Sequence, residues 1–297
     1  AGATSVYGAR GSNGVILITT KKGKKGDAQF SLSSSVGFQN NAVDGLRPFT
    51  GEEKKELLLE SIYNSYGTAY NFTEANALTW ATTNLASGTS AMRAWISRGS
   101  VEYDWTKLMK NENALMNNLD FSVSAGDDKS TLYASVGYNK TEATVIGSDF
   151  KRVTANLNYT RKLTDKWDLK TGVNVSNVKQ AGVLEQAAYF SNPNLTRYFM
   201  SPWNSPYNAD GTYFQWLTSP TQFNQLAGKN PLSLIEQQDN FGDSYRSIGN
   251  VQFDYKLHFL SELKAVANFG YDQLSGRSYG GVSPDYLNGL AGSGYNN

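Results

Sequence analysis

Apolar and polar residues alternate with a period of two along several segments of this chain, and this alternation strongly constrains its fold. In residues 29–39, Phe30, Leu32, Val36 and Phe38 alternate with polar residues. The same pattern recurs in residues 118–125, 131–139, 152–159, 167–176, 251–258 and 263–272, where Val266 is an exception. Successive side chains of a β-strand point to opposite faces, so the pattern predicts seven strands, each with one apolar and one polar face.

The connections between these segments alternate in length. Long or medium excursions, near 40–117, 141–150 and 179–246, alternate with tight turns at 126–130, 162–166 and 259–261. Outer-membrane β-barrels have strands of about ten residues, short periplasmic turns and longer extracellular loops. We therefore expect an all-β fold that is part of a transmembrane antiparallel β-barrel.

A soluble β-sandwich, such as an adhesin or a carbohydrate-binding module, is the alternative, because its strands alternate in the same way. The two folds differ in what covers the apolar face. In a barrel wall, four apolar residues point outward together, namely Val123, Val136, Leu157 and Val173. In a sandwich, the same residues pack against a second sheet.

Composition excludes several classes of function. The 297 residues contain no cysteine, a single histidine (His258) and a net charge of +1. Disulfides, cysteine metal sites and histidine-rich metal sites are therefore excluded, and no electrostatic field gathers nucleic acid. We see no constellation of nucleophile and base, so we expect no catalytic site, no metal, no cofactor and no enzyme. His258 is expected to face solvent or the lumen.

Seven strands cannot close a bacterial outer-membrane barrel, because such barrels have even strand numbers. An open sheet with one apolar face would aggregate through its edges. We therefore expect the chain to be a piece of a larger polypeptide.

The N-terminal stretch contains a distinctive motif, Ser-Val-Tyr-Gly-Ala-Arg-Gly-Ser-Asn-Gly-Val-Ile, followed by a strand-like run. A phosphate-binding glycine loop follows a strand and opens a helix, so a nucleotide site is not indicated. The motif closely resembles the end of the plug domain in the SusC/RagA family of TonB-dependent outer-membrane transporters. The residues that carry this resemblance are Tyr7, Gly8, Ala9, Arg10, Ser12, Asn13 and Gly14. A second match, formed by Asp104-Trp105 and residues 118–126 and 133–138, resembles early barrel strands of that family.

This resemblance implies a 22-stranded barrel closed by an N-terminal plug, which imports oligosaccharides or peptides across the outer membrane. It assigns residues 1–25 to the end of the plug and its linker, and residues 26–297 to the first seven strands with their loops. The implied partners are a SusD-like surface lipoprotein, outer-membrane lipid, and TonB through a segment absent from this sequence. A siderophore receptor is the alternative within the transporters.

The excursions contain further features. Thr50 and Glu53 have the spacing of a capping box before a helix, and a second helix is expected from Thr73 through Trp80 to Leu85. These helices are expected to dock the lipoprotein or to pack on the barrel rim. Four lysines at positions 21, 22, 24 and 25 are interpreted as a solvated linker rather than a lipid or nucleic-acid site.

The second excursion is rich in aromatic residues. Aromatic rings stack on sugar rings, and they also build loop cores. The candidate ligand-contacting residues are Trp203, Tyr207, Tyr213 and Trp216. Residues 208–212 resemble a calcium loop only faintly, because the first aspartate and the distal glutamate are missing, so a turn is expected there.

Overall fold

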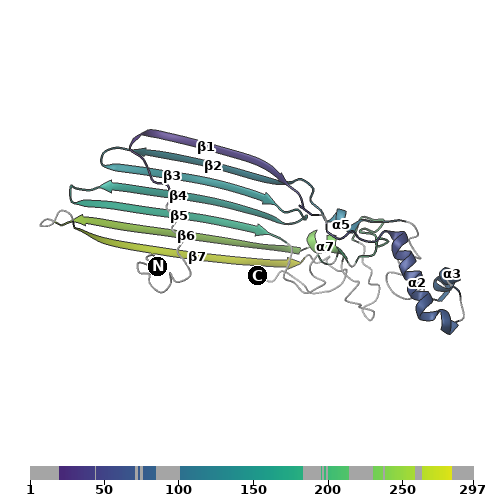
Figure 1. The fold of residues 1–297 in the computed structure, drawn as a ribbon. Helices are drawn as coiled ribbons and strands as arrows, with labels where there is room; N and C mark the ends of the chain where they lie inside the picture. Colours follow the sequence, from purple (N-terminus) through teal and green to yellow (C-terminus); the bar gives the residue numbers. More distant parts are fainter. Residues whose placement is uncertain are drawn as a thin grey trace, which may run out of the picture.

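The computed structural model describes residues 20–43, 45–70, 73, 76–84, 101–182, 195, 197–198, 200–213, 230–236, 238–257 and 263–282. In this part of the chain, seven strands form one antiparallel sheet in which every strand pairs with its neighbours in sequence (Figure 1). The strands are β1 (Gly26–Gln39), β2 (Ala114–Gly126), β3 (Ser130–Glu142), β4 (Asp149–Lys162), β5 (Trp167–Ala181), β6 (Gln238–Lys256) and β7 (Lys264–Val282). The predicted antiparallel all-β fold is confirmed.

Each of the seven predicted segments maps to its own strand, although β6 already ends at Lys256 and β7 begins at Lys264, and several strands extend beyond the prediction. β6 begins at Gln238 and β7 ends at Val282, so the second long connection ends before residue 238 and not near 246. Likewise, β2 begins at Ala114 and shortens the first excursion. The reason is physical: backbone pairing continues where the apolar alternation has stopped, and only the alternation is visible in the sequence.

The register confirms the predicted faces of the sheet. Val123 lies opposite Ala134, Ala134 lies opposite Leu157, and Leu157 lies opposite Val173. Val136 is two residues from Ala134, so it shares their face. No second sheet packs on this face in the described part of the chain. The condition set for a sandwich is therefore not met, and Phe30 and Leu32 remain 69% and 70% exposed.

The β2–β3 and β4–β5 turns lie at one end of the sheet and the helix-bearing connections at the other (Figure 1). The β2–β3 turn depends on Asp127, whose Oδ1 accepts the backbone N–H groups of Lys129 at 2.7 Å and Ser130 at 2.6 Å. These bonds hold the pKa of the Asp127 carboxyl below its usual value. The predicted short turns at 126–130 and 162–166 are confirmed, and the one at 259–261 lies outside the described residues.

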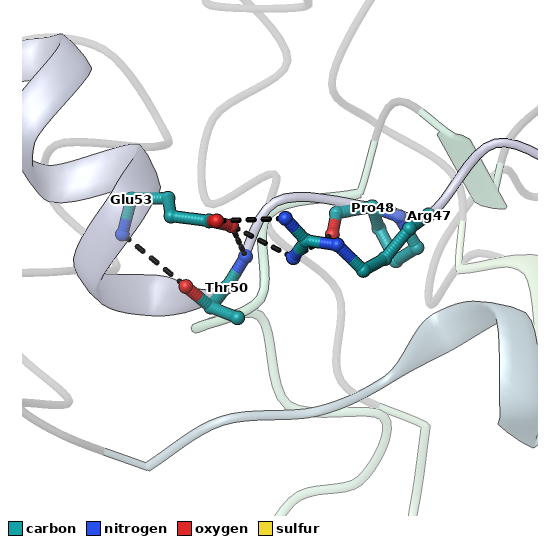
Figure 2. A network of polar contacts seen from close by, with 4 residues as sticks. All are labelled: Arg47, Pro48, Thr50 and Glu53. Atoms are coloured by element: carbon teal, nitrogen blue, oxygen red, sulfur yellow. Dashed lines mark hydrogen bonds and ion pairs between the residues drawn. The ribbon is translucent and has the colours of Figure 1, made fainter.

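Four helices are described in the connections: α2 (Gly51–Tyr70), α3 (Ala77–Asn84), α5 (Trp105–Leu108) and α7 (Pro231–Glu236). The predicted capping box at α2 is confirmed in Figure 2, because Glu53 N–H donates to Thr50 Oγ1 and Thr50 N–H donates to the Glu53 carboxylate. Asp104 and Trp105, which belong to the second match, lie in the first predicted excursion and not on a strand. Asp104 instead caps α5 by accepting the Lys107 N–H at 3.0 Å. None of the described helices is both long and apolar enough to cross a membrane.

The sheet buries few large side chains, and the apolar core of the described residues lies mainly among the connections. Its centre is the cluster Trp105, Met109, Met200 and Leu232, with Ile146 and Tyr213 packed against it. These residues come from three different connections. Backbone bonds join the same segments, because Tyr103 N–H donates to Pro202 O at 2.8 Å and Ile146 N–H donates to Met109 O at 3.1 Å. The connections therefore form one folded cap, which we call the loop platform (residues 101–113, 143–148, 200–213 and 230–236).

The polar face of the sheet holds the segment before β1. Asn158 Nδ2 donates to Lys21 O at 2.9 Å, and Lys24 N–H donates to Ser124 Oγ at 3.1 Å. A side chain on Gly23 would overlap the backbone of Leu132, so only glycine allows this close approach. The lysines of the basic run are exposed, as expected for a solvated linker, and Lys25 pairs with Asp128.

Candidate functional site

Two of the predicted ligand-contacting tyrosines lie side by side on the loop platform. Residues 207–213 fold back on themselves, and Tyr207 and Tyr213 form an antiparallel bridge. Their ring centroids are 5.4 Å apart with an interplanar angle of 36°. Tyr207 is 41% exposed and Tyr213 is half-buried. The pair therefore presents an aromatic surface on a backbone fixed by the platform.

The turn that joins the tyrosines is closed by its own polar side chains. Asn208 N–H donates to Thr212 O at 2.7 Å, and Asp210 Oδ1 accepts the N–H and hydroxyl of Thr212 at 3.0 and 2.6 Å. Gly211 adopts φ 85°, a left-handed conformation that favours glycine. The turn predicted here is confirmed. Among the described residues, no group of three or more acidic or histidine side chains is placed to hold a metal.

Glu236, at the end of α7, completes the site. The Tyr213 hydroxyl donates to the Glu236 carboxylate. α7 is fixed by Asn230, whose Oδ1 accepts the Leu232 N–H at 3.1 Å while its Nδ2 donates to Pro206 O at 2.7 Å. Pro231 follows Asn230 at the first helical position, where its missing N–H costs nothing. Asn230 therefore ties α7 to the segment that carries Tyr207.

Burial and the nearby carboxylate shift the titration of both phenols upward. Desolvation is the largest cause that raises the pKa of Tyr213, and the hydrogen bond to Glu236 is the second. Desolvation is also the largest cause that raises the pKa of Tyr207, and the negative charge of Glu236 is the second. Both phenols are therefore neutral at physiological pH, and the site combines two apolar ring faces with one carboxylate. Such a set can stack on a sugar ring or another flat apolar face and accept hydrogen bonds at its edge.

The other predicted site residues fall elsewhere. Trp203 is 2% exposed and packs in the interior beside Gly51, so its ring is not presented to solvent. Trp216, His258 and the motif residues Tyr7, Gly8, Ala9, Arg10, Ser12, Asn13 and Gly14 lie outside the described residues. The sequence reasoning missed Glu236 and Asn230. The Asn-Pro pair before a short apolar run was the available signal for a helix cap at 230.

The apolar face of the sheet is a second candidate surface, and its apolar band crosses the strands obliquely. One row of paired residues starts with Leu32, Phe121 and Val136 on β1–β3 but ends with Ser247 and Gln273 on β6 and β7. A row nearer the tight turns does the reverse. It contains Arg161 on β4 and then Leu169, Phe253 and Ala267 on β5–β7.

On β2 and β7, the loop-side (upper) edge of the band is the first polar residue on this face, counted from the tight-turn end. On β2 it is Asn117, whose row continues through Lys140, Lys151, Lys179 and Asp243 to Arg277 on β7. On β7 itself the edge is Gln273, four residues closer to the tight turns than Arg277. Four residues correspond to about 13 Å along the strands, over five strand spacings that total about 24 Å. The band is therefore inclined by about 30°, slightly less than the strand tilt of about 35–45° in outer-membrane barrels.

Comparison with known proteins identifies similar chains. The chain is 28% identical to the TonB-dependent receptor SusC of Bacteroides thetaiotaomicron over 96% of its own length and 26% of that protein. It is 27% identical to the TonB-dependent receptor P3 of Formosa agariphila, over 91% of its own length and 24% of that protein. The chain thus spans about a quarter of the length of these curated relatives. No family model matches the sequence.

Solved structures show the same fold. The RagAB peptide importer in its open-open state superposes on 94% of this chain and 31% of the importer chain, with a TM-score of 0.70 and 20% identity. A second structure of the RagAB peptide transporter gives a TM-score of 0.65 at 19% identity. The resemblance predicted from the sequence is confirmed, since this chain is similar to the TonB-dependent receptor SusC over about a quarter of that protein and shares the fold of part of the RagAB importer.

Proposed function

We propose that this chain is part of the barrel wall of a TonB-dependent transporter that imports a nutrient across the bacterial outer membrane. The observation that carries this proposal is the single sheet with a bare apolar face and all its long connections at one end. The apolar face would contact outer-membrane lipid, and the polar face would line the lumen. The relatives are named as receptors and importers, which supports a transporter and not an enzyme.

We assign residues 1–25 to the end of the plug and its linker, and residues 26–297 to the first barrel strands. The contacts of Lys21 and Lys24 with the polar face support this assignment, since a plug linker has to enter the lumen. A SusD-like lipoprotein on the loop side and TonB on the turn side would complete the assembly. Helices α2 and α3 project beyond the loop platform (Figure 1), and they are our candidate surface for the lipoprotein.

An oligosaccharide is the proposed substrate class, because the family resemblance of the sequence implies it and a tyrosine pair with a carboxylate suits a sugar. A peptide is the second candidate, favoured by the name of the RagAB importer. The experiment purifies the full-length protein from outer membranes in detergent and titrates it with a panel of oligosaccharides and with a mixed peptide library, by calorimetry. A protein that stays monodisperse without detergent would contradict the barrel assignment.

Ligand contact at Tyr207 and Tyr213, with Trp216 as a further candidate, is tested in the same titration. Each of Tyr207→Ala and Tyr213→Ala should weaken binding about tenfold, the value of one good aromatic contact. Tyr207→Phe should bind like the parent protein, because it keeps the ring. Tyr63→Ala, which removes a tyrosine of similar exposure on α2, is the matched control. Unchanged affinity in both alanine variants would rule out this site while leaving the transport proposal standing.

A further inference from the structure

Three lysines of one hydrogen-bonded row lie at the loop-side edge of the apolar band, on the outward face of β3, β4 and β5. Lys140 lies directly opposite Lys151, and Lys151 lies directly opposite Lys179. All three lysines share a face with apolar residues of the band, because Tyr138 and Val153 are two residues away from Lys140 and Lys151. The lysines therefore stand on the side of the sheet that carries the apolar band, and not on the polar face.

Like charges directly opposite each other across two strands are destabilising unless an anion compensates them. Two carboxylates supply part of this compensation. Lys140 Nζ lies 2.9 Å from Glu142 Oε1, and Lys151 Nζ lies 2.7 Å from Asp149 Oδ2. Glu142 and Asp149 are themselves directly opposite each other, on the side away from the apolar band. Each ammonium has three donors, so one carboxylate partner does not use all of them.

The position of the lysines at the loop-side edge of the apolar band indicates which lipid groups they contact. On the proposed function, the apolar band contacts acyl chains, and the first groups above the acyl chains are lipid headgroups. Lys140 is 31% and Lys151 46% exposed at the side chain, so both are accessible there. Juxtamembrane lysines attract anionic lipid phosphates, each with a free energy of about 1 kcal/mol.

We propose that Lys140 and Lys151, with Lys179 beside them, bind a phosphate group of an outer-leaflet lipid at the loop-side edge of the apolar band. This inference rests on the proposed function, because it requires that the apolar face meets lipid. Glu142 and Asp149 limit the affinity, since they compete with the phosphate for the same ammonium groups. The site is distinct from the tyrosine pair, which lies on the loop platform.

The experiment uses the full-length protein in mixed micelles of a neutral detergent with monophosphoryl lipid A, and measures retained lipid by native mass spectrometry. Lys140→Gln with Lys151→Gln should reduce lipid retention by about tenfold or more, as expected for two lysines. Lys129→Gln with Lys162→Gln is the matched control, because it removes the same charge at the tight-turn end. This control should retain lipid like the parent protein.

A variant of opposite sign keeps the test decisive if the lysine variant fails to fold. Glu142→Gln with Asp149→Asn removes the competing carboxylates, so retention of monophosphoryl lipid A should rise. Retention of a neutral phosphatidylcholine should be the same in all variants. Unchanged lipid A retention in both double variants, or equal losses for lipid A and phosphatidylcholine, would overturn the inference. A parent protein that needs no detergent would instead contradict the proposed function.

Discussion

Glu53 stabilises the first turn of α2 through partners on both sides. Its carboxylate accepts the Thr50 N–H at 2.9 Å and the two terminal nitrogens of Arg47 at 2.8 and 2.7 Å (Figure 2). The hydrogen bond from Arg47 is the largest cause and the backbone bond from Thr50 the second, and together they lower the pKa of Glu53 to about 2. A carboxyl whose pKa is lower in the folded state stabilises that state above its unfolded pKa of about 4.3. This stabilisation is lost as the pH falls toward the folded value.

Hydrogen exchange across residues 51–70 tests this arrangement. In the parent protein, protection of the first turn of α2, corrected for intrinsic rates, should decline as the pH falls from about 4.3 toward 2. Glu53→Gln should lower protection at neutral pH and remove that dependence. Thr50→Ala removes the other half of the box and should destabilise the turn by about 1 kcal/mol. Protection that is independent of pH in the parent protein would contradict the assigned role of Glu53.

For single residues, contacts between neighbours in the sequence could be predicted, whereas contacts between distant segments could not. Thr50 and Glu53 are three residues apart, so their spacing alone indicates a cap. Asn230 is different, because its second partner, Pro206 O, is brought to it only by the folded platform. Trp203 and Tyr207 are both aromatic residues of the same connection, and the sequence does not show that the first is buried and the second exposed. Which aromatic residue enters a loop core depends on its neighbours in space.

At the scale of single strands, the period of two predicted the faces, and two neighbouring residues on β2 allow this assignment to be tested. Phe121 belongs to the apolar band and stacks on Phe30 with ring centroids 6.2 Å apart. Ser122 follows it, on the opposite face, and pairs with Ser31 and Ser135. A lysine on the lipid face near the middle of an outer-membrane barrel costs about 2–4 kcal/mol, whereas lumen positions tolerate charge.

Phe121→Lys should therefore reduce the folded, heat-modifiable form of the full-length protein in outer membranes, as measured on unboiled gels. Ser122→Lys should accumulate folded protein close to the parent level. Phe121→Ala separates the loss of the ring from the added charge, and it should be intermediate. Equal folding of the two lysine variants would contradict the assignment of the faces.

The lengths of the elements were less predictable than their faces. β6 and β7 continue past the band through residues such as Gly242 and Gly276, whose pairing needs no apolar side chain. α5 and α7 are too short for a helical period to be visible, and they form because caps and the buried Trp105 and Leu232 fix them. Tertiary packing decides such short elements, so the sequence pattern alone does not reveal them.

At the scale of the whole sheet, the inclination of the apolar band predicts how the strands cross the membrane. Residues of one hydrogen-bonded row do not share a depth if the band marks the lipid. Phe121 on β2 and Gln273 on β7 belong to one row, yet the first is inside the band and the second is at its edge. Phe269 on β7 is four residues from Gln273, toward the tight turns, and lies within the band.

Spin labels at positions 121, 269 and 273 of the full-length protein, reconstituted in bilayers, measure these depths by oxygen and nickel accessibility. Labels at 121 and 269 should report a similar depth near the middle of the bilayer. The label at 273 should lie about 12 Å closer to the loop-side surface, which is the offset expected for strands tilted by about 30°. Equal depths at 121 and 273 would mean that the hydrogen-bonded rows run parallel to the membrane. A sheet of that kind has no strand tilt and cannot close into a barrel, because closure requires tilted and staggered strands.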